Sequence, residues 1–463
     1  MRSAALPAAQ GNLELYPAVA KTLYLLAALL SSEAALAISA PTEPDCHVGA
    51  YRNSQGDVLA LGATATQGTL RYYLLDGRTG LLRPAAAAHE FVAGPGWDGA
   101  SPITARARLR SCGSRHIEFD LSGGPNGAWS KIPLILTDTR FVSNGITLAG
   151  RLIEPPGGDQ RPAVVLVQGS LDTPSLDREP WQWTLPTAGI SVFVYDKRGT
   201  GASQGTYTQD FVALADDAAA AVVEARRIAP GRILRIGLQG LSQGGWVAPL
   251  AATKTAVDFL EIGYGVVGTP IEQDQWQVEY ELSHKGYGSD ILTEARELTE
   301  ETGRIAASNF ERDLSALHAI QARYKGQAWI TQFEGQYTGE LLRGELATAR
   351  EESPQVIWQY DAEAVLRKLS VPQLWIMAAE DSLAPSGPTI ARLQRLRADG
   401  LPIQIAVFPD TDHGILKFNV RPDGSRERVR YAAGYFSLQI DWIKGHLAPP
   451  YDRASFVGVS EAR

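Results

Sequence analysis

Short apolar runs, separated by longer amphipathic segments, recur along the chain after about residue 134. The runs are 163–167, 190–195, 234–238, 259–262, 374–377 and 403–408. Runs of this length and composition are typical of strands buried on both faces of a parallel sheet. Between two of them, residues 208–227 repeat apolar side chains at helical spacing, beginning with Phe211, Leu214 and Ala218. The alternation predicts an α/β fold with a mostly parallel sheet, right-handed connections and helices on both faces.

The segment before this alternation, residues 42–135, has a different pattern of short strands and turns. Residues 70–75 are apolar and aromatic and lead into Asp76 and Gly77, a dipeptide typical of tight hairpin turns. Residues 104–110 alternate between apolar and polar side chains, as a half-buried strand does. The pattern predicts a small antiparallel β domain.

Residues 271–360 interrupt the α/β alternation with a charged stretch that contains several tryptophans and tyrosines. Ile291, Leu292, Ala295 and Leu298 stand at helical spacing within it. An insertion between two sheet strands predicts a helical cap over the carboxyl edge of the sheet. We therefore expect a β domain at 41–135, an α/β domain at 136–448 that includes the cap, and a tail at 449–463.

The first forty residues have the features of a signal peptide. The apolar run 22–30 follows Lys21 and precedes small residues, and it is far shorter than the ~20 residues that span a bilayer. We expect cleavage of residues 1–40, a periplasmic or secreted protein, and no membrane span in the mature chain. An ordinary N-terminal helix is the alternative. If the protein is exported, Cys46 and Cys112 could pair in the oxidising compartment; the alternative is two unpaired buried thiols.

Composition narrows the classes of partner. The chain has 463 residues, 44% hydrophobic and 20% charged, which is ordinary for a globular protein. The net charge is −8, and no block of lysine or arginine indicates a nucleic-acid groove. Two cysteines and seven scattered histidines form no pattern of metal ligands. The turn 199–205 resembles a dinucleotide fingerprint, but its third glycine is one place late, so we expect neither metal nor cofactor. The oligomeric state stays open.

The strongest chemical signal is Gly240-Leu241-Ser242-Gln243-Gly244, directly after a predicted strand and before a helical run. This is the nucleophile-elbow pattern, in which a tight turn presents the serine at the sheet edge. Gly240 and Gly244 are small because larger side chains would clash with neighbouring backbone. The turn also places the Gln243 backbone N–H beside the Ser242 hydroxyl, as one oxyanion donor. The alternative is a chance match in a glycine-rich chain.

A serine hydroxyl needs a base, and the imidazole that serves as base needs an acid. His413 lies in a loop after the last predicted strand and Asp381 in a loop after the preceding one, in the chain order Ser, Asp, His. Glu380 is the rival acid. Asp410 and Asp412 are too close to His413 to reach its ring, and we expect them in a solvated turn.

The second oxyanion donor is expected from the loop after the first core strand. Gly169 allows the backbone to turn there, so that the Ser170 N–H faces the developing negative charge. Each such donor stabilises the transition state by ~3–4 kcal/mol. The alternative is a simple turn between a strand and a helix.

Four stretches together resemble the α/β-hydrolase superfamily, and most of all bacterial carboxylesterases with an N-terminal β domain and a helical cap, relatives of the prolyl-oligopeptidases. The stretches are PAVVLVQGS (162–170), VYDKRGTGAS (194–203), GLQGLSQGG (237–245) and PDTDHG (409–414). The resemblance implies a serine hydrolase of small-molecule carboxylic esters that works through an acyl-enzyme, with Asp196 and Arg198 as structural residues. Gln168 stands where most members have His, and Ala378 where the acid loop usually opens with Gly.

Other functions remain compatible with the same residues. A prolyl-oligopeptidase-like peptidase or a thioesterase uses the same triad, although residues 42–135 are too few for the β-propeller of such a peptidase. A non-catalytic binding module on a hydrolase scaffold is disfavoured, because nucleophile, base and acid are all present.

Overall fold

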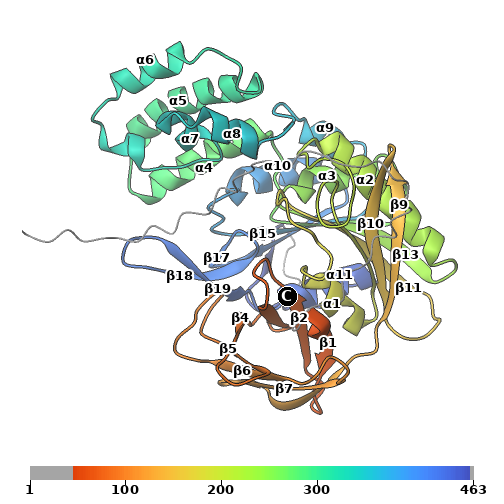
Figure 1. The fold of residues 1–463 in the computed structure, drawn as a ribbon. Coiled ribbons are helices and arrows are strands. Elements are labelled where there is room, and N and C mark those ends of the chain that lie inside the picture. The colour runs from red at the N-terminus through yellow and green to blue at the C-terminus, as the bar shows by residue number, and fades with distance from the viewer. Residues whose placement is uncertain (1–44, 459–463) are drawn as a thin grey trace, which may run out of the picture. The chain divides into compact units, whose positions relative to one another are not determined.

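The computed structural model describes residues 45–458, so the signal peptide predicted at 1–40 lies outside the described residues. Eight antiparallel strands close into a barrel near the start of this range (Figure 1). They are β1 (Gly49–Arg52), β2 (Val58–Ala63), β3 (Leu70–Leu74), β4 (Thr79–Pro84), β5 (Glu90–Ala93), β6 (Ala105–Leu109), β7 (His116–Leu121) and β8 (Asn126–Lys131). Tyr51, Phe119 and Trp129 are fully buried. The antiparallel β domain is confirmed, and pairing of β1 with β8 makes it a barrel.

The two cysteines form a disulfide, with their Cα atoms 5.5 Å apart. Cys46 lies in a short 3₁₀ turn (Asp45–His47) before β1, and Cys112 lies in the loop between β6 and β7. The bond therefore ties the beginning of the barrel to a loop on another of its hairpins.

The central sheet has nine strands in the order β20-β16-β15-β14-β13-β11-β12-β10-β9. They are β9 (Ile135–Ser143), β10 (Ile146–Glu154), β11 (Arg161–Val167), β12 (Ser191–Tyr195), β13 (Ile233–Leu241), β14 (Phe259–Gly263), β15 (Gln373–Ala378), β16 (Ile403–Phe408) and β20 (Ser455–Phe456). The strands from β12 to β16 along this order are parallel, which confirms the predicted mostly parallel sheet. Strand β20 pairs antiparallel with β16, so the segment expected as a tail at 449–463 contributes an edge strand.

Helices cover both faces of this sheet (Figure 1). The helices outside the cap are α1 (Trp181–Thr184), α2 (Phe211–Ile228), α3 (Gly244–Ala252), α9 (Ala362–Leu366), α10 (Ser386–Ala398) and α11 (Tyr435–Lys444), with a 3₁₀ turn at Leu185–Ala188. Helices α2, α3, α9 and α10 pack on one face. On the other face, α1 and α11 share a continuous apolar core with the barrel interior. The barrel therefore packs directly against the α/β domain through this shared core.

The segment expected as a cap contains five helices and has its own apolar core (Figure 1). They are α4 (Pro270–His284), α5 (Ser289–Ala307), α6 (Ser315–Arg323), α7 (Thr338–Arg343) and α8 (Leu346–Glu352), with a 3₁₀ turn at Ala328–Thr331. Thr269 starts α4 with a capping box, in which its hydroxyl accepts from the Glu272 N–H and Glu272 accepts from the Thr269 N–H. Buried Asp274 accepts from the Thr338 hydroxyl at 2.6 Å and so fixes the start of α7.

A small sheet follows the last parallel strand and touches the barrel. Its strands are β17 (Thr411–Asp412), β18 (Leu416–Val420) and β19 (Arg426–Tyr431). The Trp97 N–H donates to the Arg428 carbonyl at 3.0 Å, and the Tyr431 N–H donates to the Gly77 carbonyl at 3.0 Å. Gly77 has φ of 97°, and a Cβ atom there would lie 2.5 Å from the Tyr431 carbonyl oxygen, so glycine is required at this close approach. Among residues 45–458, no helix is both long and apolar enough to cross a membrane.

Candidate active site

Ser242 lies at the turn between β13 and α3. Its φ of 53° falls in the left-handed region, which residues other than glycine rarely adopt. A Cβ atom on Gly240 would lie 2.3 Å from the Gly244 carbonyl oxygen, and one on Gly244 would lie 2.5 Å from the Val167 carbonyl oxygen. Glycine is therefore needed at both positions for the strand, the turn and the helix to approach so closely. The strained turn places the Ser242 hydroxyl on the wall of a cavity.

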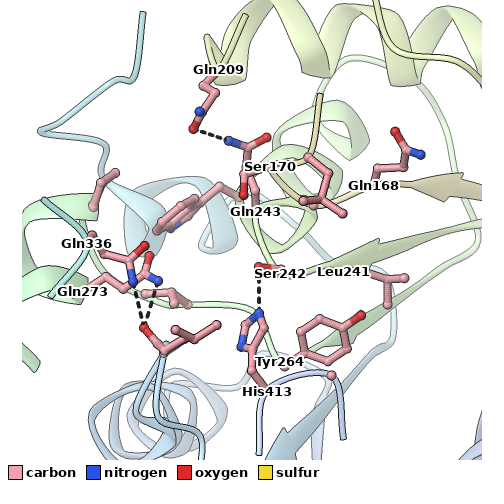
Figure 2. Close-up of a pocket in the computed structure, with 18 of the residues that line it drawn as sticks. Gln168, Ser170, Gln209, Leu241, Ser242, Gln243, Tyr264, Gln273, Gln336 and His413 are labelled. Atoms are coloured by element: carbon pink, nitrogen blue, oxygen red, sulfur yellow. Dashed lines mark hydrogen bonds between the residues drawn. The ribbon is translucent and has the colours of Figure 1, made fainter. Parts of the chain in front are cut away.

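The imidazole of His413 joins Ser242 to Asp381. Its Nε2 lies 3.0 Å from Ser242 Oγ (Figure 2), and its Nδ1 lies 2.9 Å and 3.1 Å from the two carboxylate oxygens of Asp381. Asp381 is fully buried, and its Oδ1 also accepts from the N–H groups of Leu383 and Ala384 at 3.0 Å and 2.7 Å. These backbone donors hold the carboxylate toward Nδ1. The structure thus brings together the three side chains that the sequence pattern selects.

The neighbouring acids have different positions. The side chain of Glu380 is 42% exposed and lies 3.6 Å from Arg426. The expectation of a solvated turn is wrong for Asp412, which is 8% exposed. Asp412 accepts from the Ser382 N–H at 2.8 Å and from the His413 N–H at 2.9 Å. It therefore joins the loop of the acid to the loop of the histidine.

The loop after β11 lies against the nucleophile. A Cβ atom on Gly169 would lie 3.3 Å from Ser242 Cβ. Lys197 Nζ donates to the Gly169 carbonyl at 2.8 Å, and the Tyr207 hydroxyl donates to the Ser170 carbonyl. Because N–H and C=O point in opposite directions across a trans peptide, the contact with Lys197 directs the Ser170 N–H away from that lysine.

Neither predicted oxyanion donor is used elsewhere in the part of the chain that the structure describes. Within residues 45–458, the backbone N–H groups of Ser170 and Gln243 have no hydrogen-bond acceptor. Gln243 is the first residue of the turn into α3, and its side chain donates to Gln209 Oε1 at 3.1 Å. Figure 2 shows Ser170 and Gln243 on one side of Ser242 and His413 on the other.

The cavity over Ser242 has a volume of about 550 Å³, within the range of small-molecule sites. It is lined by loops at the sheet edge, by the cap and by Trp97 of the barrel. Five glutamines lie on its wall (Figure 2): Gln168, Gln209, Gln243, Gln273 and Gln336. Gln273 and Gln336 both donate to the Leu383 carbonyl, at 3.1 Å and 3.2 Å, and so attach the cap to the acid loop. Much of the remaining lining is aromatic: Trp97, Trp181, Phe211, Trp246, Tyr264, Tyr337, Trp358 and Tyr431.

Two ionisable groups near the nucleophile have shifted pKa values. Burial raises the pKa of the Glu179 carboxyl to about 7, while the positive charges of Lys197 and Arg178 oppose that rise. Burial lowers the pKa of the Lys197 ammonium to about 8, and the negative charges of Asp172 and Glu179 oppose that fall. Glu179 lines the cavity, whereas Lys197 supports the oxyanion loop. Within the part of the chain that the structure describes, no cluster of His, Cys, Asp and Glu side chains is placed to hold a metal ion.

Sequence reasoning did not identify Arg426, Glu179 or Tyr264 as residues of the site. Arg426 bridges Asp412 at 3.1 Å and the hydroxyl of Tyr280 on the cap at 2.8 Å. The ring of Tyr264 packs edge-on against His413, with centroids 4.8 Å apart. Arg426 lies in a polar hairpin, and Glu179 and Tyr264 lie in loops, so no periodic pattern distinguishes them.

Parts of the chain are similar to a known protein family and to solved structures. A family model described as serine aminopeptidase, S33, matches residues 158–262. Among solved structures, the Pyrococcus horikoshii acylaminoacyl peptidase is 14% identical with a TM-score of 0.42, and the alignment covers 85% of this chain. This chain spans only 60% of that peptidase.

Two smaller solved proteins are also similar. The Pyrococcus furiosus esterase Pf2001 is 16% identical with a TM-score of 0.39, over 61% of this chain and 84% of the esterase. The α/β hydrolase GrgF from Penicillium sp. is 17% identical with a TM-score of 0.37, over 61% of this chain and 92% of that protein. No curated protein sequence matches the chain.

Proposed function

We propose that the chain, an α/β fold with an N-terminal β barrel in which residues 158–262 match a serine aminopeptidase model, hydrolyses carboxylic esters of small molecules through an acyl-enzyme. One observation carries the proposal: Ser242, His413 and Asp381 form a continuous chain of hydrogen bonds on the wall of a cavity. A serine hydroxyl becomes an effective nucleophile when an oriented imidazole takes its proton. Asp381, held by two backbone donors, is the group that orients the imidazole.

The reaction has two halves. Ser242 Oγ attacks the ester carbonyl carbon while His413 Nε2 takes the hydroxyl proton, and the N–H groups of Gln243 and Ser170 bind the carbonyl oxygen as it becomes negative. The tetrahedral intermediate collapses, the bond to the alcohol oxygen breaks, and His413 returns the proton to that oxygen. Water then enters and gives a proton to His413 while its oxygen attacks the acyl carbon. The bond between that carbon and Ser242 Oγ breaks, His413 returns the proton to Oγ, and the acid leaves.

The size and enclosure of the cavity support an ester of a small molecule. The cap and the barrel loop with Trp97 surround the site, and a cavity of about 550 Å³ accommodates a compact ligand rather than a folded protein. Its aromatic lining supplies apolar contact area. The same triad would also cleave a peptide bond, and the family model described as serine aminopeptidase favours a short-peptide substrate as the second candidate.

The test uses labelling and turnover together. Ser242→Ala should abolish reaction with a fluorophosphonate probe and lower hydrolysis of p-nitrophenyl esters by several orders of magnitude. Ser353→Ala is the matched control, because Ser353 lines the same cavity on the cap side and should keep both activities. Labelling of another serine in Ser242→Ala would contradict the assignment. Parallel assays on aminoacyl anilides separate the peptidase alternative from the esterase.

We also propose export, to the periplasm or outside the cell. The disulfide between Cys46 and Cys112 supports this proposal, since such bonds persist mainly in oxidising compartments.

A further inference from the structure

One wall of the cavity lies on the side from which the leaving group must depart. His413 returns its proton to the leaving oxygen, so the alcohol part of an ester lies next to the imidazole. Tyr264 packs against that imidazole, and Figure 2 shows both residues on the side of Ser242 opposite Ser170 and Gln243. The leaving-group side of the cavity is therefore the side toward Tyr264 and the barrel.

This leaving-group wall is aromatic. Besides Tyr264 it includes Tyr431, whose ring centroid lies 5.6 Å from that of Trp97 and 6.3 Å from that of Trp181. The four side chains come from distant parts of the chain: a barrel loop, the start of α1, the loop after β14 and the end of β19. Trp181 directs its indole N–H to Gln439 at 2.9 Å. The indole N–H of Trp181 is therefore already hydrogen-bonded within the protein.

A single acidic side chain accompanies these rings. Glu179 stands two residues before Trp181, is partly buried and lines the same cavity. Within the described chain, no hydrogen-bond donor and no cation contacts its carboxylate. Lys197, a nearby cation, donates instead to the Gly169 carbonyl at 2.8 Å and lies over the Tyr207 ring. The side chain is only partly buried and lines the cavity, so its unpaired carboxylate is open to a cationic ligand.

We infer that the leaving-group wall, formed by Trp97, Glu179, Trp181, Tyr264 and Tyr431, binds an organic cation carried by the alcohol part of the substrate. The faces of aromatic rings attract alkylated ammonium groups, and a carboxylate among them supplies the opposite charge. The one other charged side chain of the cavity lining on this wall, Arg428, is exposed and does not contact Glu179. The inference rests on the proposed ester hydrolysis and adds its substrate class.

The experiment compares two esters of one acid that differ only in charge. A choline ester and a 3,3-dimethylbutyl ester have the same shape, but the first has a quaternary nitrogen where the second has a carbon. In the wild-type protein we expect kcat/KM for the choline ester to exceed that for the neutral ester by about tenfold or more. Glu179→Gln should bring the ratio close to one, and thermal unfolding measured beside the kinetics shows that the variant is folded.

Controls make the outcome specific. Glu352→Gln removes another carboxylate that lines the cavity, on the cap side, and should leave the ratio unchanged. Choline alone should slow fluorophosphonate labelling of Ser242 in wild type, whereas 3,3-dimethylbutanol should not, and this readout needs no turnover. A wild-type ratio near one, an unchanged ratio in Glu179→Gln, or labelling that choline does not slow would overturn the inference. Absence of labelling at Ser242 would instead overturn the proposed function.

Discussion

At the scale of single residues, the acid loop shows why two adjacent carboxylates have different roles. Asp381 is fully buried and accepts from His413 and from two backbone N–H groups, whereas the Glu380 side chain is 42% exposed and faces Arg426. The chain order Ser, acid, His is compatible with either Glu380 or Asp381. Residues in a loop follow no periodic pattern, so the sequence does not show which of the two carboxylates faces the histidine. The side-chain direction after β15 decides between them.

Asp381→Asn should lower kcat for ester hydrolysis by ~10⁴, because the amide favours the wrong imidazole tautomer and cannot stabilise the imidazolium. Glu380→Gln is the matched change one residue away and should have little effect, since its charge is screened by solvent. Thermal unfolding of both variants, measured beside the kinetics, separates a loss of folding from a loss of chemistry. Near-full activity in Asp381→Asn with a crippled Glu380→Gln would reverse the assignment.

The raised pKa of Glu179 gives a second prediction at this scale. A carboxyl with a pKa of about 7 is mostly neutral below that pH and negative above it. The preference for the choline ester should therefore grow as the pH rises through 7, since the quaternary cation does not titrate. Lys197, with its pKa lowered to about 8, loses its repulsive charge above that pH and reinforces the trend. Arg178 is the other cation near Glu179.

The measurement is the ratio of kcat/KM for the two esters between pH 6 and 9, a range chosen around a pKa of about 7. Glu179→Gln should give a flat profile, and a flat profile in the wild type would argue against Glu179 as the responsible group.

At the scale of elements, the buried strands were predictable and the polar ones were not. Strand β16 has the predicted bounds 403–408, and β14 extends the predicted run by one residue, because both are largely apolar runs. The hairpin of β18 and β19 was not predicted, because β18 alternates over only five residues and β19 consists mostly of arginine and glutamate. Yet this hairpin carries Arg426, which contacts the loops of both the acid and the histidine.

Arg426→Gln should lower kcat by about tenfold while KM changes little, because it leaves the buried Asp412 without its charged partner and loosens the contact between the two loops. Arg426→Lys should restore part of the activity. Arg421→Gln, on the same hairpin but in an exposed pair with Glu427, is the control and should behave like wild type. Equal loss in the lysine and glutamine variants together with a lower melting temperature would indicate a purely structural role.

At the scale of the whole molecule, the sequence indicated a β domain beside an α/β domain but not how the two are joined. Barrel closure depends on pairing between β1 and β8, which are distant in sequence, and local patterns do not report such contacts. The shared core between the barrel and α11 likewise depends on side chains that look like ordinary core residues. The barrel loop that contains Trp97 thus forms part of the cavity wall. The sequence of residues 42–135 does not predict this contribution.

The disulfide provides a prediction about both compartment and stability. It closes a segment of 66 residues, and a loop of this length corresponds to ~4 kcal/mol of stabilisation through the restricted unfolded chain. Cys112→Ser should therefore lower the melting temperature clearly.

If the chain is exported, material from the periplasm or medium should begin near residues 38–41 on N-terminal sequencing. It should also show no reactive thiol in denaturant until a reductant exposes two. Two free thiols in unreduced exported protein would contradict the bond, and an uncleaved N-terminus would contradict the signal peptide while leaving the chemistry of Ser242 untouched.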